Sequence, residues 1–128
     1  IKRYKPDGIA PPFSSYSHAV EAPGDWRWLH LSGQVGVTAD GTMLGGFNAQ
    51  AAQAWKNILT ILADAGMGPA DVVKVNVFLT DPGDVPASRV AREAALGSAA
   101  PASTLFVVAG LASPDWLVEI EVIAAAPS

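Results

Sequence analysis

The spacing of apolar residues changes from helical to strand-like along the chain. Over residues 48–65 the apolar side chains recur at helical spacing, while Gln50 and other polar residues fall on the opposite side. The apolar stripe consists of Ala51, Trp55, Ile58, Leu59 and Leu62. Asn48 is suited to cap the first turn, and Gly66 is suited to end the last one. The pattern therefore predicts an amphipathic helix over residues 48–65.

A regular alternation follows at residues 72–80, which predicts a strand. One face is fully apolar and carries Val73, Val75, Val77 and Leu79. The other face is mixed, because Lys74 and Asn76 share it with Val72, Phe78 and Thr80. We expect the apolar face to lie under the helices. The mixed face is then left for water or for a partly polar subunit interface.

The remaining segments complete an α+β pattern. Asp84 and Pro86 open a second helix that ends near Gly97. Further strands are predicted at residues 17–20, 28–34, 104–108 and 116–124. The turn residues 22–25 suggest that the first two of these strands form a hairpin. The order predicts one domain over residues 1–128, an α+β sandwich with a mixed sheet and two helices on one face.

Composition narrows the possible functions. The 128 residues are 50% hydrophobic and 16% charged, whereas a typical soluble domain is about 25% charged. The low charge favours a surface partly buried against other copies of the chain. A net charge of −4 argues against a nucleic-acid partner, because such sites need clustered Lys and Arg.

The chain has no cysteine, which excludes disulfides, thiolate metal sites and a cysteine nucleophile. No apolar run is long enough to span a membrane, so no membrane partner is expected. The first residues, IKRYKPDG, have no apolar stretch behind their basic residues and do not resemble a signal peptide. We therefore expect a cytoplasmic protein.

Glu119 and Glu121 are the most specific candidates for a chemical role in the sequence. They occupy alternate positions of an otherwise apolar strand, so both carboxylates point to one face, about 6–7 Å apart. Two carboxylates that close repel each other when desolvated, which suits general acid–base chemistry. The simpler alternative is a solvated strand face, or charges that prevent edge-to-edge pairing.

The other polar candidates are individually weak. Tyr16 precedes a predicted strand, and Ser32-Gly33 ends another, where a glycine lets a ligand approach the backbone. Both are equally consistent with ordinary turns. His18 and His30 lack a recognised metal spacing, so no metal site is predicted.

Several short motifs nevertheless occur together in a specific order along nearly the whole chain. They are Tyr16-Ser17 with Ala19-Val20, Ser32-Gly33-Gln34, the helical Gln50, Gln53 and Asn57, Val72-Val73-Lys74 with Val77-Phe78-Leu79, Pro101-Ala102, and Val118-Glu119-Ile120-Glu121 with Ile123-Ala124. In this order they resemble the Rid (YjgF/UK114) family of small trimeric proteins.

The resemblance implies a chorismate-mutase-like fold and a homotrimer with a barrel-like core. In such trimers three small-molecule clefts lie between subunits. Well-studied members hydrolyse reactive enamines and imines to a 2-oxo acid and ammonia. They need neither a metal nor an organic cofactor.

The resemblance also implies roles for individual residues. Glu119 would hold the attacking water, and Tyr16 would line the cleft. Ser32 and the Gly33 backbone would hydrogen-bond the ligand, and Leu105 would offer its backbone groups.

The chain departs from the deaminases of this family at one important position. Ser103 stands where those proteins have an arginine that clamps the substrate carboxylate, which a short neutral side chain cannot do. Three accounts are open. The chain hydrolyses a different imine or enamine, a second cation such as Arg89 replaces the missing one, or the cleft only binds a small molecule as a sensor or carrier. The ribonuclease or translation-inhibitor activity ascribed to some relatives fits the acidic composition least well.

Overall fold

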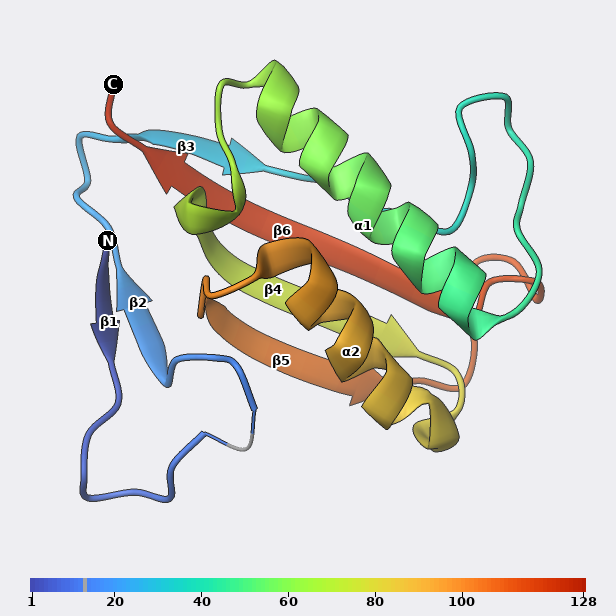
Figure 1. Ribbon diagram of the computed structural model, residues 1–128, viewed down its shortest axis with the longest axis horizontal. Helices are drawn as coiled ribbons and strands as arrows, with labels where there is room; N and C mark the ends of the chain where they lie inside the picture. Colours follow the sequence, from blue (N-terminus) through green and yellow to red (C-terminus); the bar gives the residue numbers. More distant parts are fainter. Residues whose placement is uncertain (13) are drawn as a thin grey trace.

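Two helices lie side by side on one face of a four-stranded sheet (Figure 1). The structure is a computed structural model, and it describes residues 1–12 and 14–128. The strands are β1 (Lys2–Tyr4), β2 (Ala19–Glu21), β3 (Arg27–His30), β4 (Val72–Leu79), β5 (Ala102–Val107) and β6 (Val118–Ala126). The helices are α1 (Phe47–Asp64) and α2 (Val85–Leu96), with 3₁₀ turns η1 (Pro69–Asp71) and η2 (Pro82–Asp84).

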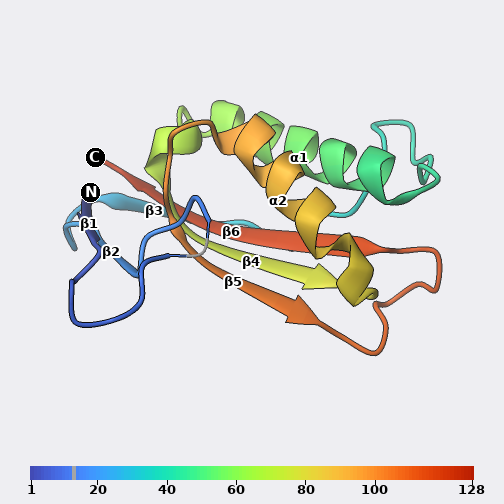
Figure 2. The same ribbon diagram turned by 60° about the horizontal axis from the view of Figure 1, so that its bottom comes forward.

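The sheet is mixed, as predicted. Its strand order is β3-β6-β4-β5, and β4 and β5 are parallel while the other pairs are antiparallel. The parallel connection is made through α2, which packs back onto the sheet beside α1. Figure 2 shows both helices above the sheet and no helix below it. This leaves β5 at one edge of the sheet and the lower face without a helix among the described residues of the chain.

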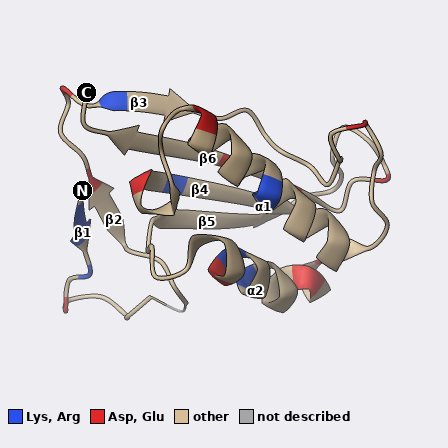
Figure 3. Cartoon of the chain, turned by 45° about the horizontal axis from the view of Figure 1, so that its top comes forward, with Lys and Arg blue, Asp and Glu red and all other residues tan. Residues whose placement is uncertain are grey.

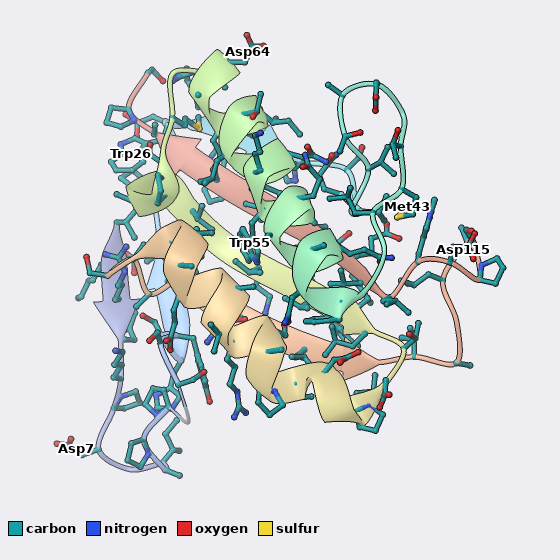
Figure 4. The ribbon with its side chains drawn as sticks, turned by 45° about the vertical axis from the view of Figure 1, so that its right-hand side comes forward. Asp7, Trp26, Met43, Trp55, Asp64 and Asp115 are labelled. Carbon is teal, nitrogen blue, oxygen red and sulfur yellow. The ribbon has the colours of Figure 1, made fainter. Side chains whose placement is uncertain are left out.

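The core lies between the sheet and the helices. Alternate residues of β6, Val118, Ile120 and Val122, are almost fully buried there, as the alternating pattern predicts. From α1 the predicted apolar stripe packs against them, and the buried Trp55 lies between the two helices and the sheet (Figure 4). The uncharged face of β6 and the helical stripe thus form one continuous apolar layer.

A register shift at the start of β4 changes one residue of the predicted apolar face. The pairing with β6 slips between Val72 and Lys74, so that Val72 joins the core cluster in place of Val73. From Val75 onward the alternation runs as predicted. A bulge inserts one extra residue, and every side chain before it therefore changes face.

The predicted hairpin near the N-terminus is wrong. β2 pairs with β1, a strand that the pattern did not predict, and β3 pairs with the distant end of β6. Strands of three or four partly polar residues carry almost no register information of their own, so tertiary pairing decides their partners. Residues 31–34 continue beside β6, where the backbone of Leu31 and Gln34 hydrogen-bonds to Val122 and Ile120, and residues 35–46 then return to α1 through turns.

The start of α1 also differs from the prediction. The helix begins at Phe47, and the preceding Gly46 is the cap residue with a φ of 82°, so Asn48 does not cap it. Phe47 is buried in the core, which fixes the first turn one residue earlier. α2 begins after Asp84 and ends at Gly97, as predicted.

Gln50 lies in the interior rather than on the polar side of α1. Its amide Nε2 donates to the carbonyl oxygens of Leu44 at 2.9 Å and Asp115 at 3.0 Å, and its Oε1 accepts from the backbone N–H of Leu117 at 2.9 Å. Gln50 thus joins the loop before α1 to the segment that enters β6. The helical pattern missed this role because an amide with several backbone partners is as easily buried as an apolar side chain.

We expect Gln50→Ala to lower the free energy of unfolding by about 3 kcal/mol, because three backbone groups lose their partner. A chemical denaturation curve measures this change. Gln53→Ala is the matched control on the same helix, since the Gln53 amide makes one side-chain hydrogen bond, to Asn57 at 2.8 Å. Equal losses for the two variants would contradict the role given to Gln50.

Candidate functional site

A pocket of about 290 Å³ opens between α2, β5 and the segment before β2. We call it the α2–β5 pocket, and its lining residues are Ser14, Tyr16, Val85, Arg89, Arg92, Ser103 and Leu105. It brings together four residues expected at the site from the sequence, namely Tyr16, Arg89, Ser103 and Leu105. Val85 and Leu105 supply apolar surface to the pocket, and Arg89 and Arg92, further along α2, supply positive charge.

Sequence reasoning missed three lining residues, Ser14, Val85 and Arg92, and Arg92 is the charged one among them. Only 6% of its surface is exposed, and its guanidinium donates to the Ser14 hydroxyl at 2.7 Å and, more weakly, to the Ser103 hydroxyl at 3.5 Å. Its Nε is buried with no hydrogen-bond partner among the described residues. A signal was present, because Ser88, Arg92 and Leu96 recur every fourth residue and form the buried stripe of α2.

The two arginines of the pocket stand one turn apart on α2. Burial lowers the pKa of the Arg92 guanidinium, and the neighbouring Arg89 lowers that pKa further, while Glu93 and Tyr16 act in the opposite direction. An arginine keeps its proton in proteins all the same, so the pocket holds two positive charges. Glu93 itself accepts a hydrogen bond from Ser15 at 3.0 Å.

Glu119 lies on the other face of the sheet. It is half-buried on β6 opposite Phe78 of β4, and it packs against Gly33 so closely that a side chain at residue 33 would displace its carboxyl end. A Cβ added at Gly33 would stand 2.7 Å from Cδ of Glu119. Ser32 is exposed beside them, so the structure brings Ser32, Gly33 and Glu119 into a second group.

Glu121, the second carboxylate of the pair, has a structural partner. Its Oε1 accepts a hydrogen bond at 2.9 Å from the side-chain amide of Asn76, the residue opposite it on β4. No comparable bond from another strand is recorded for Glu119 in the described part of the chain. The two carboxylates therefore differ in environment although they share one face.

The two groups of candidate residues do not meet within one chain. Ser103 and Leu105 are in register with Val75 and Val77, whose side chains lie on the helix-covered face. Glu119 shares the uncovered face with Phe78 and Phe106, whose rings stack at 5.0 Å. The α2–β5 pocket and the Glu119 group are thus on opposite sides of the sheet. A single copy of the chain separates them.

Basic side chains do not gather into one surface patch. Figure 3 shows Lys and Arg on several separate elements, among them β1, β3, β4, α1 and α2, with acidic residues between them. In residues 1–12 and 14–128, no three His, Asp or Glu side chains are grouped so that they could hold a metal ion. The helices described are all too short or too polar to cross a membrane.

The fold and the two groups of residues define a class of small α+β proteins, which the comparisons identify. The family model described as Endoribonuclease L-PSP matches residues 8–126. A crystal structure of the Rid family protein YyfB from Yersinia pestis, whose function is described as unknown, superposes with a TM-score of 0.87 at 33% identity and covers 98% of both chains. The chain belongs to the Rid family.

Curated relatives extend the similarity to named proteins. The 2-iminobutanoate/2-iminopropanoate deaminase of Mus musculus is 36% identical over 121 residues, which are 93% of this chain and 84% of that protein. A RutC family protein of Aquifex aeolicus is 39% identical over 71 residues, or 55% of this chain. The match spans about half the length of that Aquifex relative, 54%. These findings support a general Rid role and confirm the expected fold.

Proposed function

We propose that the chain hydrolyses a reactive imine or enamine metabolite in clefts between copies of itself, with a substrate that differs from the usual one because Ser103 replaces an arginine. The observation that carries this proposal is the close packing of the Glu119 carboxylate on Gly33. Glu119 and Gly33 are two residues that the family resemblance assigns to the reaction site. Relatives named as 2-iminobutanoate/2-iminopropanoate deaminases support the same reaction type.

The proposed hydrolysis of a C=N bond requires only a few protein groups. Glu119 accepts a proton from a water molecule, and the water oxygen attacks the carbon of the C=N bond to give a carbinolamine. With the imine nitrogen protonated at the start, the same carboxyl group then returns that proton to the nitrogen of the carbinolamine, which leaves as ammonia. The Glu119 carboxylate takes up the hydroxyl proton as the carbon becomes a carbonyl, and it passes this proton to the departing ammonia, which is released as ammonium. The Leu105 and Gly33 backbone groups and the Ser32 hydroxyl orient the substrate, and Tyr16 covers it.

Assembly is part of the proposal because one chain keeps the two groups of residues apart. The face that carries Glu119 also carries Phe106, which is 41% exposed, and Trp28, which is 43% exposed. Aromatic side chains of this size on an uncovered sheet face favour burial against another copy. A neighbouring copy that packs on this face also brings its own β5 edge, and with it an α2–β5 pocket.

Light scattering at micromolar concentration tests the assembly. We expect a mass of about 40 kDa, which is three copies of the 13.2 kDa chain. The same measurement on Phe106→Lys should show a smaller species, because the charge would be buried in the contact. A monomer mass for the unaltered protein would overturn the inter-subunit site.

The reaction is tested with a freshly generated 2-imino acid. An amino-acid oxidase produces the imine in the assay, and semicarbazide traps what has not been hydrolysed. We expect the protein to reduce the trapped amount in proportion to its concentration. A series of imines with and without a carboxylate identifies the preferred class. No acceleration with any of them would leave the alternative of a small-molecule sensor or carrier.

A ribonuclease activity has less support, although the family description contains that word. Single-stranded RNA is bound by a positively charged groove with stacking aromatic residues. The scattered Lys and Arg of this chain form no such groove in the described residues, and the net charge is −4.

A further inference from the structure

The α2–β5 pocket holds two arginines and no acidic residue among its lining residues. Arg89 and Arg92 are separated by three positions on α2, a spacing at which two like charges repel each other on a helix. Arg89 is exposed and Arg92 is buried. Glu93, the next residue along α2, offsets part of this repulsion, but it does not line the pocket and its carboxylate accepts a hydrogen bond from Ser15. An anionic ligand in the pocket can therefore supply further negative charge.

Arg92 is the more deeply buried of the two arginines, and some of its N–H groups have no hydrogen-bond partner among the described residues. The described hydrogen-bond partners of its guanidinium are the neutral hydroxyls of Ser14 and Ser103. A guanidinium has five N–H donors, so donors remain beyond these two, among them the unpartnered Nε. Burying a charge without a counter-charge is costly, and hydroxyls compensate for only part of that cost.

The neighbouring strand explains why Arg92 can occupy this place. Ser103 is the first lining residue on β5, and the hydroxyl oxygen of its short side chain lies 3.5 Å from Nη1 of Arg92. A larger side chain at residue 103 would compete with Arg92 for the same space. The serine and the arginine thus form a matched pair, in which the cation of the pocket comes from α2 and not from β5.

We propose that Arg92, held by Ser14 and Ser103, anchors a carboxylate of the ligand, and that Arg89 adds a second positive charge, so that the α2–β5 pocket prefers small dicarboxylates to monocarboxylates. The planar guanidinium suits a carboxylate, which it binds with two parallel hydrogen bonds. Val85 and Leu105 offer apolar contact to a carbon skeleton, which favours an organic acid over inorganic phosphate. A volume of about 290 Å³ suits a molecule of a few carbon atoms.

This inference deepens the proposed function, and it rests on that function for the reacting C=N group of the substrate. The binding of a carboxylate does not require turnover. Stable 2-oxo acids therefore serve as probes, since they carry the carboxylates but not the reactive imine. Loss of anion binding would overturn the role of Arg92, whereas anion binding without imine hydrolysis would count against the proposed function alone.

Calorimetric titration of the assembled protein compares four probes: 2-oxoglutarate, 2-oxobutanoate, the neutral amide 2-oxobutanamide, and inorganic phosphate. We expect affinity to fall in that order from the dicarboxylate to the amide, with phosphate weaker than 2-oxobutanoate. Arg92→Gln should weaken both carboxylates by on the order of 10- to 100-fold and leave the amide unchanged. Arg92→Lys should retain part of the carboxylate preference. Unchanged carboxylate affinity in Arg92→Gln, or phosphate binding as tight as the dicarboxylate, would overturn the inference.

Arg89→Gln is the matched control on the same helix. It should weaken 2-oxoglutarate several-fold more than 2-oxobutanoate, because only the dicarboxylate has a second carboxylate for Arg89 to attract, and so remove the advantage of the dicarboxylate. If the wild-type protein does not prefer the dicarboxylate, the role of Arg89 is wrong.

A second measurement uses the unaltered protein, because an Arg92 variant that fails to fold is uninformative. The Nε–H of a buried arginine gives a resolved NMR signal, which is assigned through the bonds of the Arg92 side chain. We expect that signal to shift on addition of 2-oxobutanoate and to stay in place with the neutral amide. A saturating carboxylate that leaves the Arg92 signal unmoved would overturn the anchoring role.

Discussion

Replacing Glu119 with glutamine should lower kcat for imine hydrolysis by about 10²- to 10⁴-fold, because the amide cannot accept a proton from water. The substitution keeps the shape of the side chain and its packing against Gly33. Since Glu119 is only half-buried, the free energy of unfolding should change little. Steady-state kinetics with the imine assay measures the rate, and a denaturation curve confirms the stability.

Glu121→Gln provides the comparison that separates catalysis from the charge of the sheet face. Glu121 lies two residues away on the same face, and its carboxylate is hydrogen-bonded to Asn76. An amide oxygen can still accept that bond, so the variant should keep most of the activity. If both variants lose activity equally, the effect is electrostatic and the water-holding role of Glu119 is wrong.

The long periodic elements were predictable because the spacing of apolar residues within each segment shows which positions are buried. α1 and β6 each carry many core residues at one regular spacing, so the loss of one position does not change the prediction. The mixed sheet with two helices on one face then follows from the order of the elements. The departures at Val72 and Phe47 are shifts of one residue, and they arise where a bulge or a buried aromatic side chain takes precedence over the local pattern.

The pairing of the short strands was not predictable in the same way. β3 lies next to β6, which is nearly the length of the chain away, and β1 was missed entirely. Such pairings are decided by the assembled core and not by the three or four residues involved. The local pattern placed Ser32 and Gly33 at the end of a strand as a weak candidate for ligand contact, and the family resemblance assigned them a role in the site.

Arg92 shows a different limit of sequence reasoning. A charged residue on a helix is normally assigned to the solvent, and Arg89 fits that expectation. Arg92 instead occupies the buried stripe between Ser88 and Leu96, where the small residues of β5 and the Ser14 segment leave room for it. The four-residue spacing of Ser88, Arg92 and Leu96 indicates that Arg92 lies on the buried stripe. Only the three-dimensional structure shows the hydroxyl groups of Ser14 and Ser103 that accept its hydrogen bonds.

Gly33→Ala should reduce turnover by about 100-fold while changing the free energy of unfolding by less than about 1 kcal/mol. The added methyl group would overlap the carboxyl end of Glu119, which is the tip of a flexible side chain. That tip can swing aside at small cost, but the carboxylate then leaves its place by about 1 Å or more, enough to disturb a positioned water. Kinetics and denaturation of the same preparation measure both effects.

Gly36→Ala is the matched glycine variant, and it should behave in the opposite way. A Cβ at Gly36 would stand 2.5 Å from Cα of Gln50, which belongs to the backbone of α1 and cannot swing aside. The helix must shift, so we expect a loss of about 3 kcal/mol in stability. The remaining folded protein should retain more activity than Gly33→Ala, since the Glu119 group is not touched. If Gly33→Ala proves as unstable as Gly36→Ala and no less active, Gly33 is there for the fold and not for the position of the Glu119 carboxylate.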